Sequence, residues 1–398
     1  MNKGRITLNK KMISLALASA VCASLFAPTF RVDAKSLHED GLKQIVEDVH
    51  YAKPATTPKE WTKKGGEYKY PIDISDSKWK IYKTHEQMLQ ACNLPKEILE
   101  TASTEELLEL VFNYPLLCDL YAYDSNEQGI EAVARQFNVF EELLNRKDAA
   151  DIFFQTYMNE NINEVVKSSE EEFRKVSEVV VLEGLLAQPD TANELSTRQK
   201  TRLFQRIEEN RESKEFNSLF EENMSTFYEI SQKNGTLEIY QTGLKAADKK
   251  YYVKTPNGTK VAVLKNKYNG KSWAEDLNNQ YRQAYPWAVQ RGPSDNRYNC
   301  HSYAWYKQSK SNRYWMNSPK KYVTDGSYRY VGKSATAKSQ KVVYKYQSGP
   351  IDTWLHSGVT LDKNGKIKSK WGQAPLMEHM RDYCPYWSQQ NVMAYYKR

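Results

Sequence analysis

A cysteine and a histidine far apart in the chain have the types and settings that thiol chemistry requires. Cys300 follows a turn formed by residues 293–296 and opens a stretch, residues 301–310, whose composition is compatible with a helix. His356 lies 56 residues further on. A free thiol is mostly protonated at neutral pH, and both a helix start and a nearby imidazole favour the nucleophilic thiolate. The pair therefore predicts a cysteine nucleophile with a histidine base.

The segment that carries His356 is expected to form a β-hairpin. Residues 355, 357, 359 and 361 are expected on one face of a strand, and His356 lies on the opposite face with residues 358 and 360. An Asn-Gly pair at residues 364–365 follows, which is a strong hairpin-turn signal, and the second strand is expected over residues 366–371. Such a strand would hold the histidine on rigid backbone against a helix laid across the sheet.

These residues resemble a known superfamily. An Asn-Cys pair opening a helix, followed by His-Ser-Gly-Val at residues 356–359, resembles the papain-like fold in its NlpC/P60 form, which includes cell-wall peptidases and amidases. The resemblance covers about residues 250–398, and its order, cysteine before histidine, matches the unpermuted branch. It implies an antiparallel sheet packed on helices. Residues 299–302 read Asn-Cys-His-Ser where the family usually has Asp-Cys-Ser-Gly, which bears on a peptidoglycan substrate more than on the fold.

The resemblance also implies a third polar residue, on the next strand, that orients the histidine. Counting back through a two-residue turn places Gln373 opposite His356, with Ser369 on the same face but nearer the turn. A longer loop would shift this register. Gln373 ranks slightly above Ser369 as the expected orienting residue, because serine holds an imidazole only weakly.

Other interpretations of these residues remain open. A cysteine in an exported protein is often buried or disulfide-bonded, and a histidine on a strand is often a hydrogen-bonded structural group. His301 is expected to be a flanking or substrate-facing side chain, and His379 to lie beneath a short helix over residues 376–381. Zinc ligation by these groups together with Cys384 lacks any Cys-x-x-Cys or His-x-x-x-His pair. The sequence therefore predicts no metal and no cofactor.

The N-terminus predicts export. Four basic residues precede an apolar run over residues 12–30, and a small residue, Ala34, precedes a cleavage site at Lys35. A signal peptide is expected over residues 1–34, followed by an extended tether over residues 35–75 that is rich in Lys, Pro and Thr. No other segment of the sequence has the roughly 20 apolar residues of a membrane span. We therefore expect a secreted protein, possible cell-wall association, and no membrane contact after signal cleavage.

Charge divides the mature chain into two domains. Residues 35–240 hold 24 Lys and Arg against 39 Asp and Glu, whereas residues 241–398 hold 28 against 9. The acidic domain, residues 76–240, is expected to be all-α, because apolar residues recur at helical spacing and capping boxes occur at Ser103 and Asp124. Its residues 85–160 resemble a helical module of uncharacterised secreted bacterial proteins. The basic domain, residues 241–398, is the expected papain-like catalytic domain of an α+β protein.

The expected function is thiol-dependent hydrolysis of an amide bond, with a peptidoglycan stem peptide or a protein as substrate. Two alternatives stay open: a non-catalytic surface-binding or wall-binding protein on the same scaffold, and acyl transfer to an amine of the transglutaminase or toxin type. The basic domain could contact an anionic wall polymer, but its opposite charge first predicts contact with the acidic domain of the same chain. Export and the lack of a nucleic-acid motif argue against nucleic-acid binding.

Overall fold

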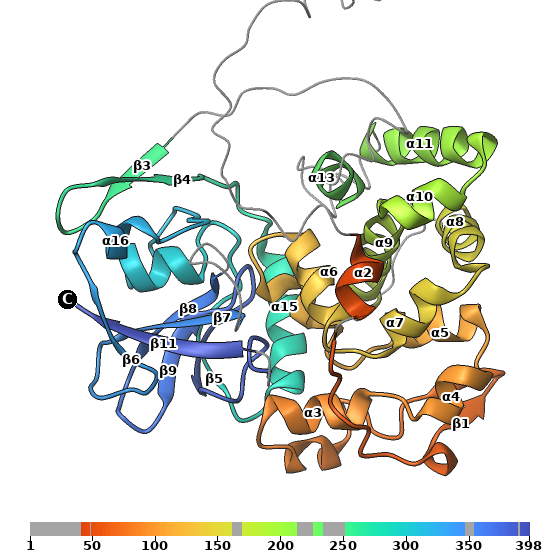
Figure 1. Cartoon of the computed structure of the whole chain (residues 1–398), viewed down its shortest axis with the longest axis horizontal. Coiled ribbons are helices and arrows are strands. Elements are labelled where there is room, and N and C mark those ends of the chain that lie inside the picture. The colour runs from red at the N-terminus through yellow and green to blue at the C-terminus, as the bar shows by residue number, and fades with distance from the viewer. Residues whose placement is uncertain are drawn as a thin grey trace, which may run out of the picture. The chain divides into compact units, whose positions relative to one another are not determined.

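The computed structural model describes residues 41–47, 49–160, 169–212, 226–233, 251–346, 354–388 and 391–398. Residues 37–398 form one compact unit; the other unit, Met1–Ser36, lies outside the described residues, as does the expected export signal. The described chain is mixed α+β, with a helical region up to Lys233 and then a sheet region built on seven antiparallel strands (Figure 1). The expected α+β class, helices first and an antiparallel sheet second, is confirmed at this level.

The helical region is built from short helices whose apolar faces meet. Their bounds are α2 (Leu42–Glu47), α3 (His85–Cys92), α4 (Lys96–Thr101), α5 (Thr104–Phe112), the 3-10 helix η3 (Leu117–Ala122), α6 (Asn126–Ala134), α7 (Val139–Asn145), α8 (Ala149–Asn159), α9 (Ser169–Leu186), α10 (Pro189–Glu194), α11 (Thr197–Glu212) and α13 (Thr226–Lys233). The apolar residues whose spacing predicted these helices, such as Leu107, Val111 and Phe140, are buried.

The two predicted capping boxes have different outcomes. Ser103 caps α5 as expected: its hydroxyl accepts from the Glu106 amide, and the Glu106 carboxylate accepts from the Ser103 amide. The second prediction is wrong, because Ser125 rather than Asp124 caps α6, accepting from the Gln128 amide at 3.2 Å. The carboxyl of Asp124 therefore serves other partners.

The stretch expected to be an extended tether is folded where the structure describes it. Helix α2 buries Val46, and a 3-10 turn, η1 (Pro58–Glu60), leads into a small hairpin of β1 (Thr62–Lys64) and β2 (Glu67–Lys69). Trp61 is buried and packs on Tyr70 with ring centroids 5.2 Å apart. Local composition favours an extended chain, but burial of these apolar side chains ties the segment to the core.

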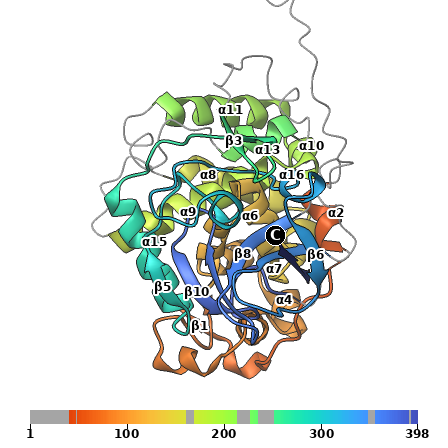
Figure 2. The same ribbon diagram turned by 90° about the vertical axis from the view of Figure 1, so that its left-hand side faces the viewer.

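The sheet region begins with a separate two-stranded hairpin, and the large sheet follows. Figure 2 turns this side of the molecule toward the viewer. The seven strands lie in the order β5-β10-β9-β8-β7-β11-β6, and every neighbouring pair is antiparallel. The bounds are β3 (Tyr251–Lys254), β4 (Lys260–Val263), α15 (Lys271–Ala284), β5 (Val289–Gly292), α16 (Lys321–Thr324), β6 (Arg329–Gly332), β7 (Lys341–Tyr346), β8 (Trp354–Thr360), β9 (Lys366–Lys370), β10 (Leu376–Met380) and β11 (Asn391–Lys397).

The hairpin around His356 is confirmed, but its register differs from the expected one. Val359 pairs with Lys368, and the chain turns through residues 362–365 rather than through a two-residue turn. The Asp362 side chain accepts from the amides of residues 364 and 366, which widens the turn. Continuing this register brings Trp371, not Gln373, level with His356.

The expected short helix over residues 376–381 is wrong, because these residues form strand β10. β10 pairs with β9 on one side and with β5 on the other, so both rows of its backbone groups find partners. Pairing on both sides outweighs the weak local preference of so short a stretch.

The helical and sheet regions share one hydrophobic core. Helix α15 packs against α9 and η3, and its Tyr281 hydroxyl donates to the Cys118 carbonyl at 2.7 Å. The Tyr285 hydroxyl donates to the Asp119 carboxylate at 2.6 Å, and the Trp79 indole donates to the Ala284 carbonyl at 2.8 Å. The expected boundary near residue 240 lies outside the described residues. Buried apolar residues from both regions form one shared cluster, and the sheet region has a second cluster of its own around Trp305 and Trp354.

Candidate functional site

Cys300 is the first residue of a short helical segment that packs against β8. The Asn299 side chain caps this segment, because its Oδ1 accepts from the Ser302 amide at 3.0 Å. The chain then widens into a π-helix, η4 (Ser302–Tyr306), and stops there, whereas the sequence predicted a helix as far as residue 310. So short a segment supplies little helix dipole. The backbone amides around the Cys300 sulfur therefore affect the thiol pKa more than the dipole of this short segment does.

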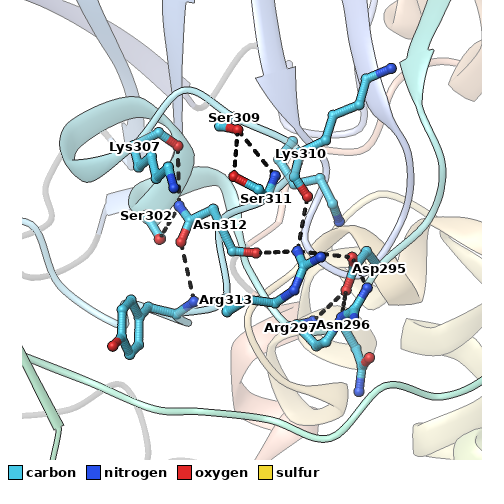
Figure 3. Close-up of polar contacts among 12 residues, drawn as sticks. Asp295, Asn296, Arg297, Ser302, Lys307, Ser309, Lys310, Ser311, Asn312 and Arg313 are labelled. Carbon is cyan, nitrogen blue, oxygen red and sulfur yellow. Dashed lines mark hydrogen bonds and ion pairs between the residues drawn. The ribbon is translucent and has the colours of Figure 1, made fainter.

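Polar contacts hold this cysteine-bearing turn on both sides (Figure 3). After the turn, the side-chain Nδ2 group of Asn312 donates to the Ser302 hydroxyl at 2.7 Å and to the Lys307 carbonyl at 3.1 Å. Before the turn, Arg297 makes a bidentate contact with the Asp295 carboxylate, 2.8 Å for each nitrogen. The position of Cys300 is thus fixed by side chains that precede and follow it.

The Cys300 thiol is closed off from solvent, with 1% of the residue exposed. Burial raises its pKa well above the usual value, and the negative charge of Asp124 acts in the same direction. The backbone amides of Ser357 and His301 and the ammonium of Lys370 oppose this rise. In the described state the thiol is protonated, with a built-in set of groups that would stabilise the thiolate.

Lys370, the last residue of β9, is the cation of this set. It is fully buried, and its ammonium donates to the carbonyls of Gly372 and Ala374 at 2.6 Å each. Burial lowers the pKa of Lys370 to about 7. The bend that follows β9 needs glycine at residue 372, where φ is +49° and a Cβ would lie 2.5 Å from the Ala122 carbonyl.

His356 lies on β8, fully buried and with its ring flat against Tyr386. The two ring centroids are 3.6 Å apart and the planes differ by 8°. Neither ring nitrogen has a hydrogen-bond partner among the described residues, and Cys300 makes no hydrogen bond to it. Burial, reinforced by the positive charge that His379 or His301 would carry, lowers the pKa of His356 well below its usual value. The result is a neutral imidazole with both nitrogens open.

The two residues expected to orient His356 have other contacts. Gln373 lies in the bend after β9, where its backbone amide donates to the Tyr121 carbonyl at 3.0 Å. The Ser369 hydroxyl shares the face of His356 but bonds the Nε2 atom of His379 at 2.8 Å. Ser369 therefore orients His379, and neither residue contacts His356.

His301 is not the flanking or substrate-facing side chain that the sequence predicted. It is fully buried, and its Nδ1 atom lies 2.7 Å from the Ser357 hydroxyl. Its Nε2 atom lies 3.7 Å from the Asp124 carboxylate. Burial lowers the pKa of His301 to about 4, so the ring is neutral.

Sequence reasoning missed three residues of this site: Asp124, Lys370 and Tyr386. Asp124 carries a local signal, but that signal indicated a helix cap. Lys370 occupies an ordinary strand position, and nothing near it in sequence marks it as buried. Tyr386 follows a Cys-Pro pair that gives no hint of a ring stacked on a histidine. Each reaches the site through contacts distant in the chain.

The remaining cysteines are structural. Cys92, Cys118 and Cys384 are free and buried. Across the described ranges, no three His, Cys, Asp or Glu side chains gather where they could hold a metal ion. None of the helices in the described part of the chain is both long and apolar enough to cross a membrane.

No protein-family model, no curated protein and no solved structure matches this chain.

Proposed function

We propose that this protein is a secreted, thiol-dependent hydrolase of amide bonds, with Cys300 as nucleophile and His356 as base on a papain-like scaffold. The observation that carries the proposal is the open imidazole of His356 in the core, one residue before the Ser357 amide that faces the Cys300 sulfur. A buried polar group without a partner costs about 1–3 kcal/mol. A role for His356 as the base that deprotonates Cys300 would explain why this cost is retained.

The residues divide the reaction between them. His356 takes the thiol proton as Cys300 attacks the substrate carbonyl, and returns it to the leaving amine. The Cys300 backbone amide would contribute to stabilising the oxyanion that forms. Lys370 and the amides of Ser357 and His301 favour the thiolate before attack. Water then hydrolyses the acyl-enzyme, which releases the enzyme unchanged.

The proposed substrate is a peptidoglycan stem peptide, and the proposed location is outside the cell, at the wall. The net charge of +19 over residues 241–398 supports an approach to anionic wall polymers. Tyrosine side chains on this region, such as Tyr252 and Tyr330, are more than half exposed and suit stacking on sugar rings.

Turnover requires the helical region to move away from the thiol. The Tyr386 hydroxyl donates to the Ala122 carbonyl at 2.5 Å, and the Gln373 amide donates to the Tyr121 carbonyl. These contacts lay the end of η3 over the site. The same closure favours a second candidate, a non-catalytic scaffold that binds the wall and keeps Cys300 as a core residue.

Digestion of purified peptidoglycan separates these candidates. The mature protein should release new amino groups, Cys300→Ala should abolish release, and Cys384→Ala should preserve it. Cys384 is the matched control because it is equally buried and free in the same region. Wall binding without release, unchanged in Cys300→Ala, would favour the scaffold. Activity only with an added amine acceptor would favour acyl transfer.

A further inference from the structure

One carboxylate of the helical region contacts both chain neighbours of Cys300. Asp124 lies between η3 and α6, and its Oδ1 atom accepts from the Asn299 side chain at 2.9 Å. Its Oδ2 atom lies 3.7 Å from the Nε2 atom of His301. Asn299 and His301 are the residues immediately before and after Cys300. The carboxylate thus spans the nucleophile from outside the sheet region.

On the first side, Asp124 completes a fully bonded Asn299. The Asn299 Oδ1 atom accepts from the amides of Ser302 and Met316, at 3.0 and 3.1 Å. One hydrogen of its Nδ2 group goes to the Met316 carbonyl at 2.8 Å, and the other goes to Asp124. Without Asp124, one buried hydrogen of the residue that caps the Cys300 turn would have no partner.

On the second side, Asp124 faces the ring nitrogen of His301 that does not contact Ser357. The Trp305 indole can only donate, and it donates to the Ser357 hydroxyl at 3.0 Å. The same hydroxyl lies 2.7 Å from the Nδ1 atom of His301. The Nε2 atom has no hydrogen-bond partner among the described residues and faces the Asp124 carboxylate at 3.7 Å.

We infer that Asp124 is a positioning residue of the thiol site, supplied by the helical region, which holds Asn299 and His301 and so fixes Cys300 between them. The inference rests on the proposed function, because it names a residue that acts on the proposed nucleophile. It assigns the helical region a part in the site beyond packing. Without Asp124, one Nδ2 hydrogen of Asn299 would lose its acceptor and the Nε2 atom of His301 would lose the charge that faces it.

The role of Asp124 can be measured separately from its effect on stability, because its charge also affects the thiol pKa of Cys300. The titratable groups around the Cys300 sulfur are Asp124, Lys370 and Tyr386, with His301 and His356 on the adjoining elements. Burial raises the pKa of Asp124 to about 7, although the hydrogen bond from Asn299 favours its ionised form. An ionised Asp124 disfavours the thiolate, so removing its charge should make the thiol more acidic while loosening its placement.

The same segment contains a matched control. Asp119 is a second buried carboxylate, 3.5 Å from the Nε2 atom of His85, and it accepts from the Tyr285 hydroxyl. It also lies where the two regions meet, but it contacts neither neighbour of Cys300. Asp119→Asn therefore reproduces the loss of a buried charge without touching the thiol.

The test compares Asp124→Asn and Asp119→Asn in the full mature chain. Asparagine retains an acceptor for Asn299 but removes the negative charge that faces the Nε2 atom of His301. Asp124→Asn should lower kcat on peptidoglycan about tenfold, leave KM unchanged, and shift the pH profile of Cys300 alkylation to lower pH. Asp119→Asn should change neither kcat nor the profile. Unfolding midpoints of both variants, measured alongside, show any shared loss of stability.

Two results would overturn the inference: equal effects of both variants on kcat, or an unshifted alkylation profile in Asp124→Asn. Alkylation needs no substrate, so its profile decides the role of Asp124 even if Cys300→Ala leaves turnover intact. The turnover measurement can therefore contradict the proposed function while the alkylation profile still supports the role of Asp124, and the reverse also holds.

Discussion

Two buried histidines lie in the same sheet, on strands separated by β9, and they differ in their hydrogen-bond partners. His379 on β10 donates through Nδ1 to the Met380 carbonyl and accepts through Nε2 from the Ser369 hydroxyl, each at 2.8 Å. His356 on β8 has neither kind of partner and only stacks on Tyr386. Both rings are neutral, because burial lowers the pKa of each. Depth alone therefore does not distinguish the two histidines, whereas the unpaired ring nitrogens of His356 do.

The largest expected effect separates the two histidines by activity. His356→Phe keeps a flat ring on Tyr386 but removes the base, so turnover should fall by about 10²–10⁴-fold. His379→Gln, which can retain a donor and an acceptor, should keep wild-type turnover. Release of amino groups from peptidoglycan measures both variants. Equal losses in the two variants would remove the distinction between the histidines.

Stability should change in opposite directions at the two positions. His356→Phe removes two unpaired buried nitrogens and should raise the free energy of unfolding by about 1–3 kcal/mol. His379→Phe leaves Ser369 and the Met380 carbonyl without their partner and should lower it by about the same amount. Urea denaturation gives both values. A destabilised His356→Phe would mean that His356 has a structural role.

The pH dependence of stability should reveal His379. Burial lowers its folded-state pKa to about 4, against roughly 6.5 in an unfolded chain. Between these pH values the unfolded chain binds a proton that the folded chain excludes, so this stabilisation is complete above about pH 6.5 and is lost as the pH falls toward 4. The free energy of unfolding of the wild type should therefore fall more steeply over this window than that of His379→Phe. Parallel slopes would contradict the lowered pKa.

The smallest effect is expected at Gln373. Its backbone makes the contacts with Tyr121 and Asp295, and these survive in Gln373→Ala, which should change stability by no more than about 0.5 kcal/mol. Its turnover should match the wild type. A loss of turnover comparable to that of His356→Phe would restore Gln373 as the residue that orients the histidine.

The sequence predicts what local pattern determines. Alternation and an Asn-Gly pair identify the His356 hairpin, and a turn signal identifies the helical start at Cys300. The register of the hairpin is not predictable in the same way. One side chain, Asp362, widens the turn and so changes which residue of the second strand lies opposite His356. Asp124 contacts Asn299 across 175 residues of chain, and Tyr386 stacks on His356 from another part of the fold, through contacts that no periodicity encodes.

The most direct test of the thiol site compares four cysteines within one protein. Cys92, Cys118, Cys300 and Cys384 are all buried and free; burial raises the thiol pKa of Cys300, and the amides of Ser357 and His301 together with Lys370 oppose that rise. The rate of iodoacetamide labelling, read for each cysteine by mass spectrometry at pH 7, should be highest at Cys300. That rate should drop in His356→Phe while the other three remain unchanged. Labelling of Cys300 no faster than that of the other cysteines, or unaffected by His356→Phe, would contradict the assignment of Cys300 and His356 as nucleophile and base.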